Sequence, residues 1–204
     1  MEKLSVITPV NNRRQYQSHV VGTLKANQFL PIYNGKSAAR ALNEGIDQAN
    51  NDLCVFCHQD VRFPPDWIER LDILESLDFG VVGVFGLDMD GKFVGSVIDG
   101  GGIFFGGKLP AKAQSVDELL FMFRKSSGLR FDESLGGWHL YGADICLQAM
   151  DRGLDNYIID ACVGHLSPGS ISTEFLVCRK DIERKWRGNT KIRNFKTTCT
   201  EILL

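Results

Sequence analysis

The sequence contains no apolar run long enough to cross a bilayer. Its longest apolar stretches, such as residues 79–87, are interrupted by glycine. They are far shorter than the roughly 20 residues that a membrane-spanning helix needs. The first residues also lack the cationic segment, apolar core and cleavage site of a secretory signal. We therefore expect no transmembrane segment, and the default compartment is the cytoplasm.

The chain has little net charge and few cysteines. Its 204 residues carry 23 Lys and Arg against 25 Asp and Glu, a formal net charge of -2, so nothing global favours nucleic-acid binding. Six scattered cysteines are too few for a disulfide scaffold, and free thiols are expected. With 44% apolar residues, the length predicts one domain over residues 1–204, with 170–204 as a basic C-terminal helix and tail. The oligomeric state does not follow from the sequence.

Apolar stretches of strand length alternate with helical patterns along the chain. Strands are predicted over residues 4–10, 53–57, 79–87 and 157–163, and helices over 36–50, from Pro65 onward and over 143–152. Residues 95–107 are dense in glycine and predict loops and short strands near a ligand, whereas the apolar run within 115–125 fits a strand or a helix. The alternation predicts an α/β sandwich with a largely parallel sheet.

Two candidate sites for chemistry follow from this layout. His58, Gln59 and Asp60 come directly after a buried strand, at the carboxyl edge where open α/β sheets bind ligands. A carboxylate there binds Mg²⁺ or Mn²⁺ through hard oxygen atoms, or else caps the following helix. His165 ends the last core strand, where a histidine is either a ligand or a hydrogen-bonded structural residue.

The second site lies around Asp144, which opens a predicted helix behind a glycine-rich turn. The aromatic side chains of Trp138, His139 and Tyr141 are close enough in sequence to shape a pocket for a sugar or a base. The alternative is that Asp144 only complements the positive end of the helix dipole.

Cys54 and Cys57 have the spacing of a zinc or redox motif. They lie in an apolar strand where residues i and i+3 point to opposite faces, and no second cysteine pair completes a tetrahedral site. We interpret both as small core residues.

Five short motifs in a fixed order carry a family resemblance over residues 4–170. They are Ile7 to Asn11, Asn34 to Gly45, Val55 to Val61, Phe131 to Glu133 with Trp138 to Asp144, and finally His165. The series resembles the family 2-like glycosyltransferases of GT-A fold, and is most similar to the small bacterial branch that includes the StrF-type domain. The implied fold is a three-layer α/β sandwich with a mixed, mostly parallel sheet.

The resemblance also implies roles for individual residues. Where the family has a DXD motif this sequence has His58-Gln59-Asp60, so Asp60 and His165 are implied ligands of Mn²⁺ or Mg²⁺, and His58 contacts either the metal or the nucleotide. Asp144 is the implied general base. The implied nucleotide-sugar contacts are Thr8, Pro9, Lys36, Asn43, His58, Gln59, Trp138 and His139.

The implied reaction is the transfer of a sugar, with inversion, from a UDP- or GDP-sugar to a hydroxyl acceptor. The acceptor would be a glycan or a lipid-linked molecule in bacterial polysaccharide or glycoconjugate synthesis. Two alternatives remain at this point. One is a non-catalytic nucleotide-sugar or glycan binding module on the same fold, favoured by the short chain and the altered motif. The other is a thiol or zinc protein built on Cys54 and Cys57.

Overall fold

The structure is a computed structural model, and it describes residues 3–167, 171–188, 192 and 194–204. The strands are β1 (Leu4–Val10), β2 (Gln28–Tyr33), β3 (Leu53–Cys57), β4 (Val61–Arg62), β5 (Val82–Gly83), β6 (Phe85–Asp88), β7 (Phe93–Asp99), β8 (Gly102–Gly106), β9 (Ala111–Val116), β10 (Leu120–Arg124), β11 (Asn156–Ile158), β12 (Val163–His165), β13 (Asn194–Lys196) and β14 (Glu201–Leu203). The helices are α1 (Arg13–Tyr16), α2 (Ala38–Gln48), α3 (Tyr141–Asp151) and α4 (Thr173–Trp186), with a π-helical turn η1 (Gln17–Val21) and the 3₁₀ segments η2 (Glu69–Ser76) and η3 (Lys125–Ser127).

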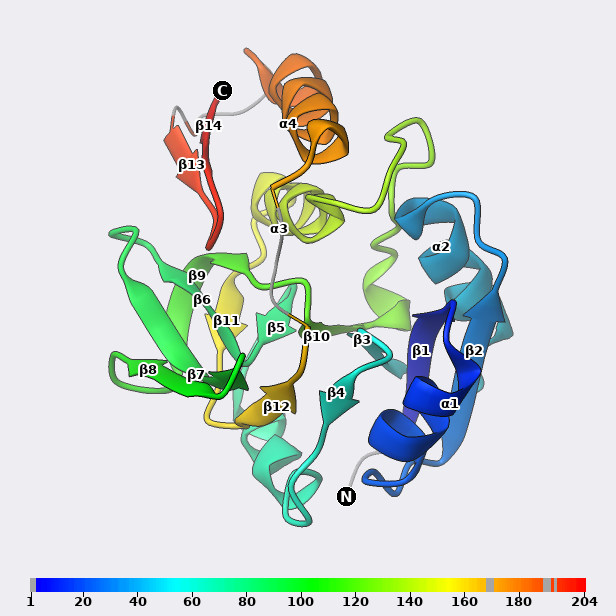
Figure 1. The fold of residues 1–204 in the computed structure, drawn as a ribbon. Helices are drawn as coiled ribbons and strands as arrows, with labels where there is room; N and C mark the ends of the chain where they lie inside the picture. The colour runs from blue at the N-terminus through cyan, green and yellow to red at the C-terminus, as the bar shows by residue number, and fades with distance from the viewer. Residues whose placement is uncertain (1–2, 168–170, 189–191, 193) are drawn as a thin grey trace.

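One large mixed sheet organises these elements (Figure 1). Its strand order is β2-β1-β3-β10-β5-β11-β9-β6-β7-β12-β4, and β8 pairs with β7 on its other side. The pairings make β1, β2, β3, β5, β11, β6, β4 and β8 point one way, and β10, β9, β7 and β12 the other. Most strands therefore point in one direction although many neighbouring pairs are antiparallel.

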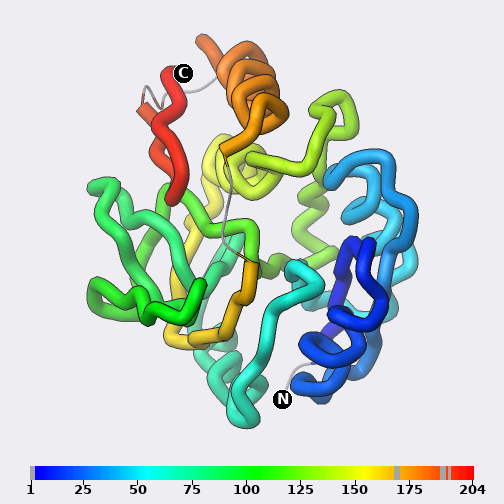
Figure 2. Tube along the Cα trace, in the orientation of Figure 1, coloured from blue at the N-terminus to red at the C-terminus, as the bar shows by residue number. Residues whose placement is uncertain are grey.

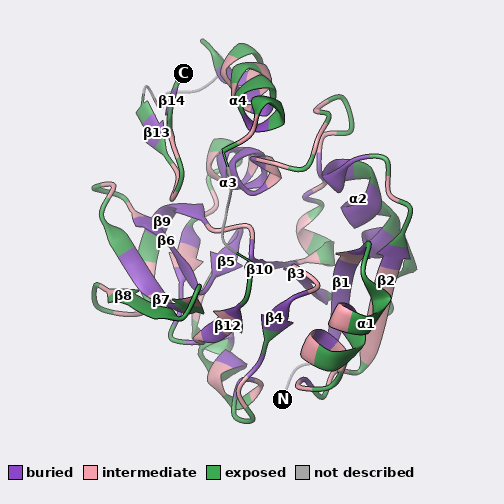
Figure 3. Cartoon of the chain, in the orientation of Figure 1, coloured by how far each residue is buried: buried purple, intermediate pink, exposed green. Residues whose placement is uncertain are grey.

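Both faces of the central strands are buried, as Figure 3 shows. Side chains alternate along β3, so Cys54 and Phe56 join the apolar cluster beneath α2, α3 and α4, while Val55 and Cys57 join the cluster beneath η1 and η2. Cys54 and Cys57 thus lie on opposite faces of the sheet, in agreement with their interpretation as core residues. Burial raises the pKa of the Cys57 thiol to about 12, which makes it a poor metal ligand.

The close approach of α2 to β1 explains a glycine in the middle of that helix. A Cβ atom at Gly45 would lie 2.2 Å from Cγ2 of Ile7, a distance that no packing tolerates. Ser37 caps the helix by accepting a hydrogen bond from the Arg40 N–H at 3.4 Å. The predicted strands at 4–10 and 53–57 and the helices beginning near residues 36 and 143 are confirmed.

Three predictions about elements were wrong. Residues 79–87 form two short strands, β5 and β6, with different neighbours, and residues 157–163 contribute to two strands, β11 and β12. After Pro65 the chain forms turns and the 3₁₀ segment η2 instead of an α-helix, and Trp67 in this stretch is buried in the core with its indole N–H donating to the Ala161 carbonyl at 3.1 Å. The ambiguous run at 115–125 is a strand–turn–strand, the end of β9 and then β10.

The C-terminal segment is more structured than a solvated tail. Helix α4 packs over α3 through Phe175, Ile182 and Trp186, and the hairpin β13–β14 follows it (Figure 2). Residues 170, 189–191 and 193 of the predicted tail lie outside the described residues. Among the helices of the described ranges, none combines the length and the apolar composition that a membrane crossing requires.

Candidate functional site

The carboxyl ends of β1 and β3 are tied together by Gln59. Because the two strands are parallel neighbours, the loops that follow them start at the same sheet edge. The Gln59 Oε1 atom accepts hydrogen bonds from the N–H groups of Asn11 at 3.0 Å and Asn12 at 2.9 Å, and its Nε2 donates to Oδ1 of Asn11 at 2.6 Å. The predicted nucleotide contact Gln59 therefore has a positioning role, holding the loop after β1 against the loop after β3.

A cluster of three potential metal ligands lies at the same edge. The antiparallel pairing of β4 with β12 sets His165 opposite Val61, which brings His165 next to Asp60. Nε2 of His165 lies 3.4 Å from Oδ1 of Asp60 and 3.3 Å from Nδ1 of His58. One ligand atom from each of the three residues lies within 4.8 Å of the others. The structure therefore brings together Asp60 and His165, which are far apart in sequence, and adds His58.

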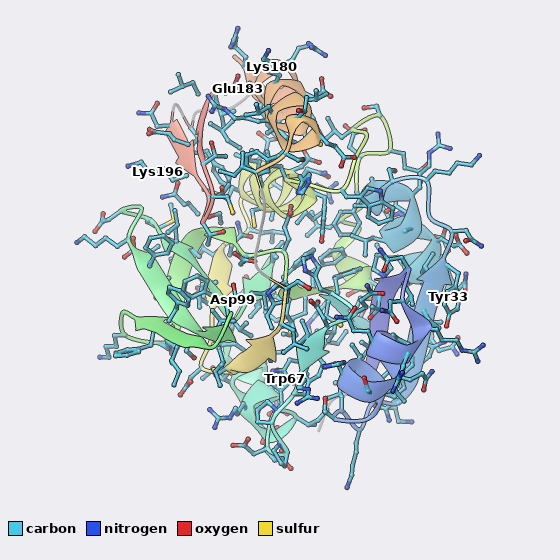
Figure 4. All side chains as sticks on the ribbon, viewed as in Figure 1. Tyr33, Trp67, Asp99, Lys180, Glu183 and Lys196 are labelled. Carbon is cyan, nitrogen blue, oxygen red and sulfur yellow. The ribbon has the colours of Figure 1, made fainter. Side chains whose placement is uncertain are left out.

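Asp99 is a member of this site that sequence reasoning missed. The parallel pairing of β7 and β12 sets it opposite His165, and its Oδ1 lies 3.3 Å from Nδ1 of His165. In Figure 4, Asp99 lies near the middle of the view, where β7 meets β12. A carboxylate on the far nitrogen of a histidine fixes the ring and leaves the other nitrogen to face a cation. The glycine-rich segment 95–107 predicts loops and short strands. It could not show that Asp99 lies opposite His165, because the sequence does not indicate how β7 pairs with β12.

The protonation preferences of the cluster suit cation binding. Burial lowers the pKa of His58, and the neighbouring His165 lowers it further, which favours the neutral imidazole that a metal ion binds. Burial is the largest single influence on Asp60 and His165 and opposes their charge, but their mutual hydrogen bond, the further bonds from Ser167 and to Asp99, and the neighbouring charges together outweigh it. The pKa of Asp60 is consequently lowered and that of His165 raised. A bound cation would replace the His165 proton, so its affinity should increase with pH.

The donor set itself tests which cation fits. Two imidazole nitrogens and one carboxylate oxygen form the set that first-row divalent metals such as Mn²⁺ accept with open positions to spare, whereas Mg²⁺ prefers oxygen ligands. The second carboxylate oxygen of Asp60 already accepts the Ser167 N–H at 3.1 Å, which orients the group. His58, Asp60 and His165 therefore fit a divalent transition metal.

Helix α3 meets this cluster through its first residue, Tyr141. The Tyr141 hydroxyl lies 3.1 Å from Nε2 of His58. Leu140, directly before the helix, adopts a left-handed φ of 63° and offers no capping side chain. Glu118 supplies the cap instead, with Oε1 accepting the Gly142 N–H at 2.7 Å. Glu118 thus positions Tyr141 beside the metal ligands.

The buried cap makes stability dependent on pH. Burial, with a smaller effect of the adjacent Asp117 charge, raises the pKa of Glu118 to about 8 despite the bond from Gly142. The folded chain thus holds this proton more tightly than the unfolded chain, whose glutamates titrate near 4.5. The protonated Glu118 side chain therefore contributes its whole share to the free energy of unfolding below about pH 4.5. This contribution should decrease as the pH rises and be lost above about pH 8.

Glu118→Gln keeps an oxygen for the Gly142 N–H and removes the titration. In urea unfolding we expect the variant to lie within about 1 kcal/mol of the wild type at pH 5 and to exceed it by about 4 kcal/mol at pH 8.5. Glu133→Gln, on a half-exposed side chain, is the control and should change neither value. Equal stabilities of wild type and Glu118→Gln at both pH values would contradict the assignment.

Asp144, the predicted general base, accepts hydrogen bonds at both of its carboxylate oxygens. Its side chain is 2% exposed. Oδ1 accepts from Trp186 Nε1 at 2.8 Å and Lys185 Nζ at 2.7 Å, while Oδ2 accepts from Gln148 Nε2 at 2.8 Å and Lys185 Nζ at 2.9 Å. In this arrangement the carboxylate joins α3 to α4. Its role as a base remains a prediction, and it requires α4 to release at least one of these donors.

A pocket opens beside Asp144, between the N-terminal end of α2, the loop before α3, and α4. Its walls include Ala38, Phe131, His139, Tyr141 and Asp144. Because Tyr141 contacts both this pocket and His58, the pocket adjoins the candidate metal site.

The remaining predicted contacts fall into two groups. Thr8 is fully buried in β1, with its hydroxyl 3.2 Å from Sγ of Cys57, and Asn43 braces the Phe131 backbone through both ends of its amide. The structure gives these two side chains packing roles. Pro9 lies near the carboxyl end of β1, and Lys36 is exposed before α2.

Of the two predicted aromatic contacts before α3, Trp138 and His139, one is exposed and the other is partly engaged within the protein. Trp138 is 39% exposed and faces the Gly35 backbone, where a Cβ atom would lie 3.1 Å from the indole ring. His139 packs edge-on against Phe175 and lies 3.9 Å from a carboxylate oxygen of Glu174. Trp138 is thus available to a ligand, whereas His139 is partly engaged with α4.

Comparison with known sequences finds a family-model match in the central segment. The family model described as glycosyl transferase family 2 matches residues 28–93, which include α2, β3, His58 and Asp60. A protein of Fuscovulum blasticum named "ATP synthase subunits region ORF 6" is 27% identical over 146 residues, covering 65% of this chain and 59% of that protein. The chain thus spans less than two thirds of the length of this curated relative.

Comparison with solved structures identifies the fold. GalNAc-T7, solved with UDP, GalNAc and Mn²⁺, has a TM-score of 0.65 at 11% identity, over 90% of this chain and 47% of that chain. S. aureus TarS 1-349 in complex with UDP-GlcNAc has a TM-score of 0.59 at 11% identity, over 93% of this chain and 68% of that chain. The predicted GT-A fold, with its mixed sheet, is confirmed. The family model matches residues 28–93 and these neighbours show the fold, while glycosyltransferase activity and the StrF-type branch stay predictions.

Proposed function

We propose that the protein transfers a sugar from a nucleoside-diphosphate sugar to a hydroxyl acceptor and requires a divalent transition metal, with Mn²⁺ the best fit. The observation that carries this proposal is the convergence of His58, Asp60 and His165 at the carboxyl edge of β3 and beside β12. The family match includes two of these residues, and the GalNAc-T7 structure of the same fold holds UDP and Mn²⁺.

The residues of the cluster divide the work of binding the donor. A divalent cation bound here would neutralise the charge that develops on a departing diphosphate. His58 and Asp60 would hold the cation from the β3 side and His165 from the β12 side, with Asp99 fixing the His165 ring. Lys36, exposed before α2, and Trp138 are the proposed contacts to the diphosphate and the donor nucleoside or sugar.

Asp144 is the proposed base that takes the proton of the acceptor hydroxyl, a role generally worth about 10²–10⁴-fold in rate. It lines a small pocket next to Tyr141, and the acceptor hydroxyl would reach it there once α4 releases one of its donors. Inversion at the anomeric carbon follows from direct displacement by that hydroxyl. The proposed setting is bacterial polysaccharide or glycoconjugate synthesis, with a glycan or lipid-linked acceptor.

One observation favours the second candidate, a nucleotide-sugar binding module without turnover. Both oxygens of Asp144 are already occupied by Lys185, Trp186 and Gln148. The two candidates agree on donor binding and differ in whether Asp144 ever accepts a proton.

Calorimetry with UDP and GDP tests the shared part of the proposal. We expect one of them to bind with Mn²⁺ present and to lose binding when EDTA removes the metal. Absence of heat with both nucleotides in Mn²⁺ would refute the site. Donor hydrolysis of UDP- and GDP-sugars then separates the candidates: turnover that disappears in Asp144→Asn supports the transferase, and binding without turnover supports the module.

A further inference from the structure

Strand β8 is an apolar edge strand with no covering element. Its sequence is Gly-Ile-Phe-Phe-Gly, and Ile103, Phe104 and Phe105 are 68%, 54% and 82% exposed. Figure 3 shows most of it as exposed, at the margin of the sheet. It pairs only with β7, and no strand in the described residues lies along its outer edge. It also lacks the charges, prolines and bulges that usually protect edge strands from association.

The hydrogen-bonding direction of each β8 residue follows from the pairing of β7. Ser96 donates its N–H to the Val84 carbonyl, on the β6 side of β7, so Val97 directs its N–H and carbonyl to the opposite side. Val97 pairs with Phe104, which makes Phe104 the residue bonded to β7. Ile103 and Phe105 therefore direct their backbone N–H and carbonyl groups outward, away from the sheet.

This outward edge selects a protein strand over a lipid surface. Backbone groups that enter hydrocarbon without partners cost several kcal/mol each, so an open sheet edge is not buried in a bilayer. A second strand would satisfy the groups of Ile103 and Phe105 directly.

We propose that β8 pairs antiparallel with β8 of a second copy of this chain, across a two-fold axis at Phe104. In this register Ile103 of each copy lies opposite Phe105 of the other, as a hydrogen-bonded pair with matching apolar side chains. Gly102 opposes Gly106, and the two Phe104 residues face each other as a non-hydrogen-bonded pair. The strand is thus complementary to itself, which a symmetric dimer requires.

The flanking charges favour the antiparallel orientation. Asp99 precedes β8 and Lys108 follows it. Antiparallel pairing brings Lys108 of each copy to the Gly100–Gly101 turn next to Asp99 of the other, whereas parallel pairing would set like charges together.

The exposed area predicts a weak dimer. Three phenylalanines, the two in β8 and the 57% exposed Phe93, offer roughly 350–400 Å² of apolar surface at about 150–250 Å² per ring. With Ile98 and Ile103 and the strand backbone, the area available for burial in the two copies is at most about 1,000 Å², the lower end of specific interfaces. We therefore expect dissociation at micromolar concentrations.

Site-specific oxidation tests both the dimer and its register, in a Cys199→Ser background that removes the exposed cysteine. Phe104→Cys should form a disulfide-linked dimer in air, because directly opposed residues have Cα atoms about 4.5–5.5 Å apart. Phe105→Cys, one residue away and even more exposed, lies opposite Ile103 of the second copy and should remain mostly uncrosslinked. Equal crosslinking of the two variants indicates random collision and overturns the proposal.

Sedimentation velocity from about 5 to 200 μM provides the test without cysteines. The wild type should change from monomer to dimer over this range, and Phe105→Asp should stay monomeric. Val177→Asp, at an apolar residue on α4 that is 53% exposed, is the control and should dimerise like the wild type. A monomeric wild type at 200 μM, or a dimer that survives Phe105→Asp, overturns the proposal. So does a monomeric wild type that binds phosphatidylglycerol vesicles through Phe105, since β8 would then face a lipid surface.

Discussion

Asp60→Asn is expected to weaken Mn²⁺ binding at least about 100-fold and to abolish metal-dependent binding of UDP or GDP. Asp60 is the anionic member of the cluster, and asparagine keeps its shape while removing the charge. The amide oxygen can still accept the Ser167 N–H, so the fold should be preserved. Titration of Mn²⁺ by calorimetry or electron paramagnetic resonance measures the loss directly, without requiring activity.

A graded series separates metal binding from general damage. Asp99→Asn removes only the carboxylate behind His165 and should cost about 10–100-fold in metal affinity, the usual effect of a residue that orients a ligand. Asp66→Asn, an exposed carboxylate paired with Arg70, should change nothing. If Asp60→Asn binds Mn²⁺ like the wild type, the cation does not use the proposed cluster.

The metal cluster was partly predictable because its members end buried strands. The apolar run at 53–57 and the polar residues after it indicate a sheet edge, and the late His165 follows another apolar stretch. What joins them is the pairing of β4, only two residues long, with β12. Asp99 depends on a second pairing, of β7 with β12, in a segment whose glycines suggested loops. No local sequence pattern encodes either register.

The segments that escaped prediction are those whose local pattern conflicts with their tertiary setting. The sequence of β2 carries only a weak strand pattern, because the strand lies at the sheet edge and contains Pro31, which edge strands tolerate. The tail after residue 170 is rich in charge, and its pattern indicated a solvated helix. In the structure Lys185 and Trp186 reach back to Asp144, a contact that depends on how α4 docks. Charge composition alone does not show whether a lysine meets water or a buried carboxylate.

Lys185→Met is expected to lower the free energy of unfolding by about 3–5 kcal/mol, because it leaves a carboxylate without its cation in the interior. Lys185 Nζ lies 2.7 Å from Oδ1 of Asp144 and 2.8 Å from Oδ2 of Asp132. Burial opposes charge on Asp132, yet the hydrogen bonds from Lys185 and Ser134 together hold its pKa at about 2. Urea unfolding at pH 7 measures the loss, and Lys180→Met on the same helix is the control.

The double variant Asp144→Asn with Lys185→Met distinguishes a structural from a catalytic carboxylate. With the charges removed together, most of the stability lost in Lys185→Met should return, giving a coupling of about 2 kcal/mol or more. If Asp144 is also the base, donor turnover stays absent in the double variant although folding is restored. Lys185→Met alone should then raise turnover relative to its folded fraction, because one donor to the base has been removed. Restored folding together with wild-type turnover in the double variant would exclude Asp144 as the base and leave it only the role of joining α3 to α4.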